Sequence, residues 1–215
     1  MTTCVWQNNI LIFGNMDLDS YLTVESEGSA QFVEQRSRFL SFAAFAENEA
    51  SALDYVAALR RKYHDARHVC YAFRLRGGLE RSSDDGEPSG TAGRPILGRL
   101  DAAGMENVVV VVVRYFGGVK LGTGGLVRAY RTAAQLALDA SVMAPRQVWV
   151  TMRCTFDYAL MNAVMQLTRR FGINVRERKY DDARCVLLLD VQPSVCDSVR
   201  QCVANWRAGV EIETL

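Results

Sequence analysis

The hydrophobic and polar positions of this chain follow two patterns, and the change comes at Pro145. The strongest feature before Pro145 is Val108–Val113, six valines in a row with no polar residue between them. A strand without polar alternation is typical of a sheet that is covered on both faces. We therefore predict that this strand forms the centre of an N-terminal domain over residues 17–143.

Shorter strands and three helices are expected around the valine strand. Four apolar runs predict strands, over residues 21–24, 30–35, 39–46 and 68–75. The first three of these would form a meander. Asn48 can cap a helix that ends near Tyr63. Two more helices are expected, over residues 95–103 and 126–140. The polar, glycine-rich segment 77–93 is expected to be one long loop.

After Pro145, apolar and polar residues alternate from Val148 to Phe156, which is the period of a half-buried strand. Asp157 is expected to cap the helix that follows, and the later pattern completes the order βαββαβ. This order is typical of a ferredoxin-like sandwich. We therefore predict an α+β protein of two domains, with a ferredoxin-like C-terminal domain over residues 146–215 and a boundary near residues 142–146.

Composition limits the classes of partner. The net charge is +1, which excludes a strongly basic nucleic-acid clamp by composition alone, so any anion site must come from local clustering. The six cysteines form no CxxC pair, as expected of buried thiols in a reducing cytoplasm. No apolar run approaches the roughly 18 residues of a membrane span, so no membrane partner is expected.

The first sixteen residues, MTTCVWQNNILIFGNM, have no basic start and no small-residue cleavage site. We interpret residues 1–16 as a leader without the features of a signal peptide, and a possible site of disorder. Met16 is an alternative start of the protein.

A glycine-rich stretch, RYFGGVKLGTGGLVRAY, directly follows the valine strand. A buried strand that runs into glycines and then a helix can place backbone N–H groups and a helix dipole at one anion. The candidate binding residues are Arg114, Gly117, Gly118, Lys120, Gly122, Thr123, Gly124, Gly125 and Arg128. The spacing matches neither the nucleotide P-loop nor the dinucleotide fingerprint. The alternative is that these glycines only permit a tight crossover with positive φ angles.

A second unusual segment, SSDDGEPSGTAGRP, adds the candidates Asp84, Asp85, Glu87, Ser89 and Arg94. The carboxylates could hold Mg²⁺, or they could belong to a turn that bonds its own backbone. We expect no metal and no cofactor. Both segments follow central strands and are expected to form one rim, where the basic residues either neutralise the carboxylates or bind an anion.

Nucleophilic catalysis has no visible machinery, because the chain has only two histidines and no serine or cysteine has an obvious base partner. For His64, His68 and Cys70 a structural role is favoured over zinc, since no fourth ligand lies nearby in sequence. The chain is therefore expected not to be an enzyme.

Four motifs in order, RSRFLSF, ARHVCYAFR, RSSDDGEPSGTAGRPIL and VVVVRYFGGVKLGTGGLVRAY, resemble the IMPACT family, specifically its bacterial YigZ-type branch. The resemblance runs from about Arg36 to Ala140. It implies that the first domain has the fold of the second domain of a small-subunit ribosomal protein, as in domain IV of elongation factor G. The C-terminal domain would resemble domain V of that factor.

The resemblance implies a link to RNA, the ribosome or the regulation of translation, and no settled enzymatic activity. Eukaryotic relatives restrain a starvation-sensing kinase with an additional RWD-type module, which has no room before Tyr21, so that role is not carried over. We expect a non-catalytic RNA- or ribosome-binding factor. The alternatives are an enzyme or sensor that binds a phosphometabolite or nucleotide at the glycine-rich stretch, and a module that docks a protein partner in translation control.

Overall fold

The computed structural model describes residues 18–180, 184–206 and 209–215. The expected leader, residues 1–16, lies outside this range. The chain divides into two compact units, one of residues 22–146 and the other of residues 147–215 together with the chain before Leu22. Each unit has its own core, which agrees with the predicted α+β fold of two domains.

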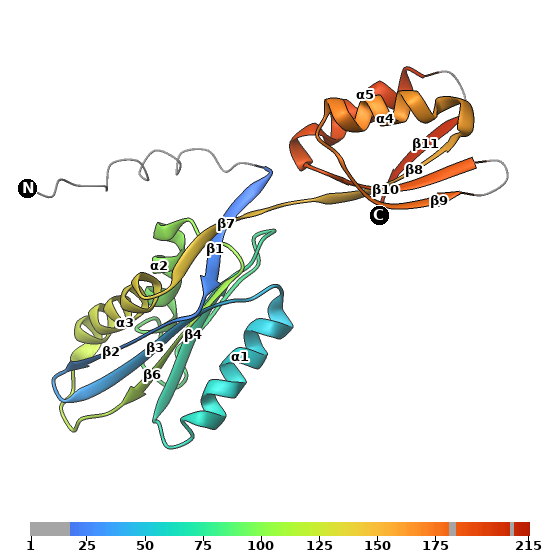
Figure 1. The fold of residues 1–215 in the computed structure, drawn as a ribbon. Helices are drawn as coiled ribbons and strands as arrows, with labels where there is room; N and C mark the ends of the chain where they lie inside the picture. Colours follow the sequence, from blue (N-terminus) through green and yellow to red (C-terminus); the bar gives the residue numbers. More distant parts are fainter. Residues whose placement is uncertain (1–17, 181–183, 207–208) are drawn as a thin grey trace, which may run out of the picture. The chain divides into compact units, whose positions relative to one another are not determined.

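The N-terminal unit is built on a five-stranded sheet in which every neighbouring pair is antiparallel. The strands lie in the order β2 (Gly28–Glu34), β3 (Ser37–Phe45), β6 (Val108–Tyr115), β4 (His68–Arg74) and β5 (Glu80–Ser83). Helix α1 (Glu49–Lys62) covers one face, while α2 (Gly93–Ala103) and α3 (Gly122–Asp139) cover the other (Figure 1).

The central position of β6 explains the run of valines. Val108, Val110 and Val112 pack in the core beneath α2 and α3, and the three alternate valines pack in the core beneath α1. All six are completely buried. The prediction of a central strand with two covered faces is confirmed.

Helix α1 begins as predicted at Asn48. The Asn48 Oδ1 accepts a hydrogen bond of 2.9 Å from the backbone N–H of Ser51, and the Ser51 hydroxyl accepts one of 3.1 Å from the backbone N–H of Asn48. This capping box satisfies two backbone donors at the helix start. Three basic residues in the last turn complement the negative end of the helix dipole.

Two predictions about the N-terminal unit were wrong. Strand β1 (Ser20–Ser26) does not join a meander but pairs with β7 (Val142–Gln147) in a separate two-stranded sheet. Residues 142–147 therefore form a strand rather than a bare boundary. Periodicity identifies a strand but not its partner, and Pro145 obscured β7 because proline is tolerated only where no ladder hydrogen bond is needed.

The segment 77–93 is not one loop, because Glu80–Ser83 forms β5 and α2 already begins at Gly93. Strand β5 pairs with β4 at the edge of the sheet, with Tyr71 opposite Ser83. It escaped prediction because all four of its residues, ERSS, are polar. An edge strand that faces solvent can be polar and still be held by its backbone hydrogen bonds.

The C-terminal unit is a four-stranded antiparallel sheet with two helices. Its strands lie in the order β11 (Val210–Thr214), β8 (Val150–Asp157), β10 (Arg184–Val191) and β9 (Asn174–Tyr180). Helices α4 (Met161–Arg170) and α5 (Cys196–Ala204) follow the short 3₁₀ turns η1 (Tyr158–Leu160) and η2 (Pro193–Val195). This order of elements and strands is that of a ferredoxin-like sandwich.

The core of the C-terminal unit contains Met152, Cys154 and Phe156, so the predicted alternation along β8 is confirmed. The prediction that Asp157 caps a helix is wrong. Its side chain makes no capping hydrogen bond and instead lies 3.5 Å from the Arg184 guanidinium. Of the helices in the described parts of the chain, none is long and apolar enough to cross a membrane.

Candidate nucleic-acid interface

Asp84 is committed to the start of helix α2. Its carboxylate accepts hydrogen bonds from the backbone N–H groups of Gly90 at 2.7 Å, Ala92 at 2.9 Å and Gly93 at 2.8 Å. Burial by itself raises the pKa of this carboxyl, but the three hydrogen bonds and the charge of Arg94 outweigh it and hold the pKa below its ordinary value. Asp84 therefore acts as a structural cap.

Asp85 ties the same loop to strand β4 and helix α1. Its carboxylate accepts a hydrogen bond of 2.6 Å from the backbone N–H of Val69 and forms an ion pair with Arg60. Its backbone oxygen lies 2.8 Å from Nδ1 of His68. Across the described residues, no group of three His, Cys, Asp or Glu side chains could hold a metal ion. The carboxylates of Asp84 and Asp85 thus accept hydrogen bonds from backbone N–H groups, and Asp85 also pairs with an arginine.

Glu87 and Arg114 form a buried ion pair between the acidic loop and the end of β6. The distance from Arg114 Nη1 to Glu87 Oε1 is 2.6 Å, and the two side chains are 6% and 3% exposed. The same oxygen accepts a hydrogen bond of 2.8 Å from the Tyr130 hydroxyl of α3, and Arg114 also donates to the Ser37 hydroxyl at 3.3 Å. The acidic loop and the glycine-rich stretch thus meet as predicted, but they meet through buried side chains rather than in an exposed rim.

Cys70 and His68 of β4 complete this buried cluster. The Cys70 sulfur lies 3.0 Å from the backbone oxygen of Asp84 and 3.3 Å from the Tyr130 hydroxyl, and His68 Nε2 lies 3.9 Å from the Glu87 carboxylate. Burial raises the pKa of the Cys70 thiol well above its usual range. The thiol therefore stays protonated and is a poor nucleophile.

The glycines of the second segment have two structural roles. A Cβ at Gly117 would collide with the backbone of Arg36, and Gly118 and Gly122 have φ angles of 84° and 70°, which favour glycine. Helix α3 begins at Gly122, so Thr123, Gly124 and Gly125 form its first turn rather than a loop. The prediction that α3 begins at 126 placed it four residues too late, because glycines are poor helix formers in isolation.

The surface at this end of α3 is basic. Lys120, Thr123, Gly124 and Arg128 are all exposed, and the N-terminal residue Leu121 gives the helix no side-chain cap. Neither Lys120 nor Arg128 forms an ion pair with an acidic residue among those described. The Arg128 guanidinium lies beside Gly124, 3.7 Å from where a Cβ would be.

A groove of about 420 Å³ between α2 and α3 continues the basic character. It is lined by Gly90, Arg94, Pro95, Gly98, Arg99, Ala102, Val127 and Arg131. Ser89 and Arg94 are exposed at the end where α2 begins. Sequence reasoning missed Arg99 and Arg131. The only available signal was the spacing of Arg131 three residues after Arg128, which places the two side chains near each other on one helix.

The comparisons with known proteins agree with this architecture. The Impact N-terminal domain model matches residues 35–138. An IMPACT family member in the pol 5′ region of Thermus thermophilus is 48% identical over 143 residues, which is 66% of this chain and 78% of the relative. IMPACT family member YigZ of Escherichia coli strain K12 is 43% identical over 48% of this chain and 53% of the relative.

A crystal structure described as that of a hypothetical protein matches with a TM-score of 0.66 and 27% identity. The match covers 92% of this chain and 98% of that one, so it includes both units. The two-domain α+β architecture is thus shared with a solved structure. The chain belongs to the IMPACT family, in its YigZ-type branch.

Proposed function

We propose that this protein binds RNA, free or in the ribosome, through the basic surface at the start of α3, and that it does so without catalysis. The observation that carries the proposal is that Lys120 and Arg128 are exposed beside a glycine-lined helix start and pair with no described acidic residue. Phosphate groups are the anions that such a surface fits. The regulation of translation is the context that family membership favours.

The distribution of charge supports a local interface. With a net charge of +1, the protein cannot bind RNA by overall attraction, so affinity depends on the few unpaired cations. Arg114 does not count among them, because Glu87 already neutralises it inside the fold. Binding should therefore be modest and should weaken steeply with salt, as phosphate contacts do.

We propose that the protein is not catalytic because its potentially reactive side chains near the basic surface, Cys70 and His68, are buried. The Cys70 thiol is buried and protonated, and His68 is held between the Asp85 backbone and the Glu87 carboxylate. A general base or nucleophile must reach a substrate, and neither of these side chains is free to do so.

The C-terminal unit is a weaker candidate for RNA. On the sheet, Arg153 pairs with Glu213, Lys179 with Glu177, and Arg184 with Glu211. Strand β10, with the sequence RCVLLLDV, carries no aromatic residue on which a base could stack. We propose that this unit acts as a scaffold or docks a protein partner.

Fluorescence anisotropy with a labelled single-stranded RNA, between about 50 and 200 mM salt, tests the proposal. In the variant Lys120→Glu/Arg128→Glu we expect the affinity at low salt to fall. The slope of log K against log salt should become shallower by about 1.4, at about 0.7 per phosphate contact.

The matched control is Arg61→Glu/Arg67→Glu, which makes the same change of charge on exposed residues at the α1 side of the sheet. It should bind RNA almost like the parent protein. No binding at low salt by the parent, or an equal loss in both variants, would contradict the proposal.

A further inference from the structure

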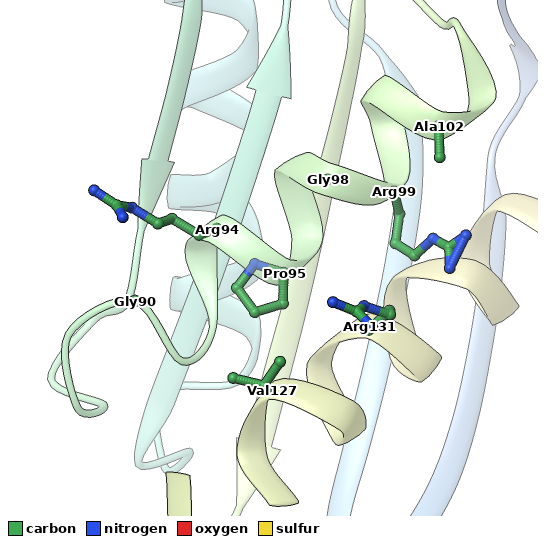
Figure 2. Close-up of a pocket in the computed structure, with 8 residues that line it drawn as sticks. All are labelled: Gly90, Arg94, Pro95, Gly98, Arg99, Ala102, Val127 and Arg131. Atoms are coloured by element: carbon green, nitrogen blue, oxygen red, sulfur yellow. The ribbon is translucent and has the colours of Figure 1, made fainter. Parts of the chain in front are cut away.

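Two arginines without acidic partners line the groove between α2 and α3. Figure 2 shows that Arg99 of α2 and Arg131 of α3 extend into the same stretch of the groove, whereas Arg94 points away from both. Neither Arg99 nor Arg131 forms an ion pair or hydrogen bond with any residue the structure describes. Two like charges that line one groove without an acidic partner repel, and an anion between them would remove the repulsion.

The Arg99 guanidinium has no hydrogen-bond or ion-pair partner among the residues that the structure describes. Its Nε atom is buried and has no hydrogen-bond acceptor. Buried donors in native proteins almost always have a partner, because an unsatisfied one costs about 1–3 kcal/mol. Arg99 as a whole is half-buried, so an anion in the groove would offset the positive charge of its guanidinium, although it would not reach the covered Nε.

The shape of the groove fits a small ligand. Its volume of about 420 Å³ falls at the lower end of the roughly 300–1,000 Å³ of small-molecule sites. Pro95, Ala102 and Val127 supply small or apolar walls. A Cβ on Gly98 would meet nothing within 4 Å, so the space above this helix position is open.

We propose that this groove binds the phosphate group of a phosphate monoester between Arg99 and Arg131. A monoester carries a charge of about −1.5 to −2 at neutral pH and has three acceptor oxygens, which matches two guanidinium groups in charge and in donors. A phosphodiester or a carboxylate carries a single charge and would leave one arginine unpaired. The site is centred on Arg99 and Arg131, with Arg128 next to it on the same helix, and does not depend on RNA binding at Lys120 and Arg128.

The same chemistry can come from a phosphorylated small molecule or from the terminal phosphate of an RNA strand. The first arm of the test uses ribose 5-phosphate, with ribose at equal concentration as the uncharged control, and measures the thermal midpoint. The second arm compares the binding of one short RNA that carries either a 5′-phosphate or a 5′-hydroxyl group.

If the ligand is a phosphorylated small molecule, we expect ribose 5-phosphate, but not ribose, to raise the thermal midpoint of the protein in a saturable way. If the ligand is the terminal phosphate of RNA, we expect the 5′-phosphate to tighten RNA binding. Arg131→Gln should abolish the effect and at the same time raise the midpoint of the free protein, because it removes the repulsion with Arg99. Lys120→Glu alone should retain the response to phosphate even if RNA affinity falls, which separates this site from the proposed RNA surface, whereas a carboxylate at position 128 would lie beside Arg131.

Three results would overturn the proposal. The first is no response to the phosphate group in either arm. The second is a response that persists unchanged in both Arg99→Gln and Arg131→Gln. The third is a lower midpoint for the free Arg131→Gln protein, which would mean that this arginine stabilises the fold by itself.

Discussion

Replacing Glu87 with alanine would leave the Arg114 guanidinium buried, with no anion beside it. In the parent protein the two side chains are 2.6 Å apart and almost fully excluded from solvent. The same change removes the acceptor of the Tyr130 hydroxyl. Removing one partner of a buried ion pair strands the other charge in a medium that solvates it poorly.

The expected loss in the free energy of unfolding is about 3–5 kcal/mol, the range for breaking a buried pair from one side. This is a large part of the 5–15 kcal/mol that typically stabilises a domain. The double variant Glu87→Gln/Arg114→Met separates charge from packing. This double variant removes both charges, keeps an acceptor for Tyr130 and fills similar space. Its free energy of unfolding should therefore fall by only about 1 kcal/mol, the contribution of one neutral hydrogen bond.

The assay must report the N-terminal unit alone. The three tryptophans, Trp6, Trp149 and Trp206, all lie outside residues 22–146, so tryptophan fluorescence would follow the rest of the chain. Native-state hydrogen exchange at the amides of β6, measured at Val110 and its neighbours, reports the opening free energy of the correct core.

A loss below about 1 kcal/mol in Glu87→Ala would refute the reasoning, because it would mean that water reaches Arg114 and that the pair is not desolvated. A double variant that is as unstable as Glu87→Ala would also refute it. The cost would then come from shape rather than from an unpaired charge.

Three further predictions concern single residues. Asp84→Asn should cost about 1–2 kcal/mol at neutral pH, because it removes the charge from the hydrogen bonds to three backbone N–H groups and turns one of the two acceptor oxygens into a donor. The pKa of Asp84 is lower in the folded than in the unfolded protein, so its contribution to the free energy of unfolding is present above the unfolded pKa of about 3.9. This contribution is lost as the pH falls through the folded pKa, so the stabilities of parent and variant measured by urea titration should converge in acid. Gly117→Ala should destabilise the N-terminal unit through its collision with Arg36, whereas Gly98→Ala, in an open helix position, should stabilise it by about 0.5–1 kcal/mol; equal hydrogen-exchange effects would contradict this. Cys70 should resist iodoacetamide at pH 8 in the native protein and react in urea, and peptide mapping that finds rapid native labelling would contradict its burial.

The sequence alone determined the features that depend on local pattern. The run of valines indicated a strand with two covered faces, and Asn48 marked the start of α1, because burial and capping act within a few residues. The alternation after Pro145 led to the ferredoxin-like order in the same way. The four motifs placed the chain in its family without any knowledge of the site.

Only the tertiary structure decided which charges are available to a ligand. Glu87 and Arg114 are 27 residues apart in the chain, and they neutralise each other inside the fold. The pairing of β4 with β6 sets His68 opposite Arg114 in the same cluster. Lys120 and Arg128 carry the same charge as Arg114 and remain exposed. Arg99 and Arg131 line one groove only because α2 and α3 pack side by side. The type of a charged residue is local, but its partner is set by strand register and helix packing over long separations, which periodicity cannot report.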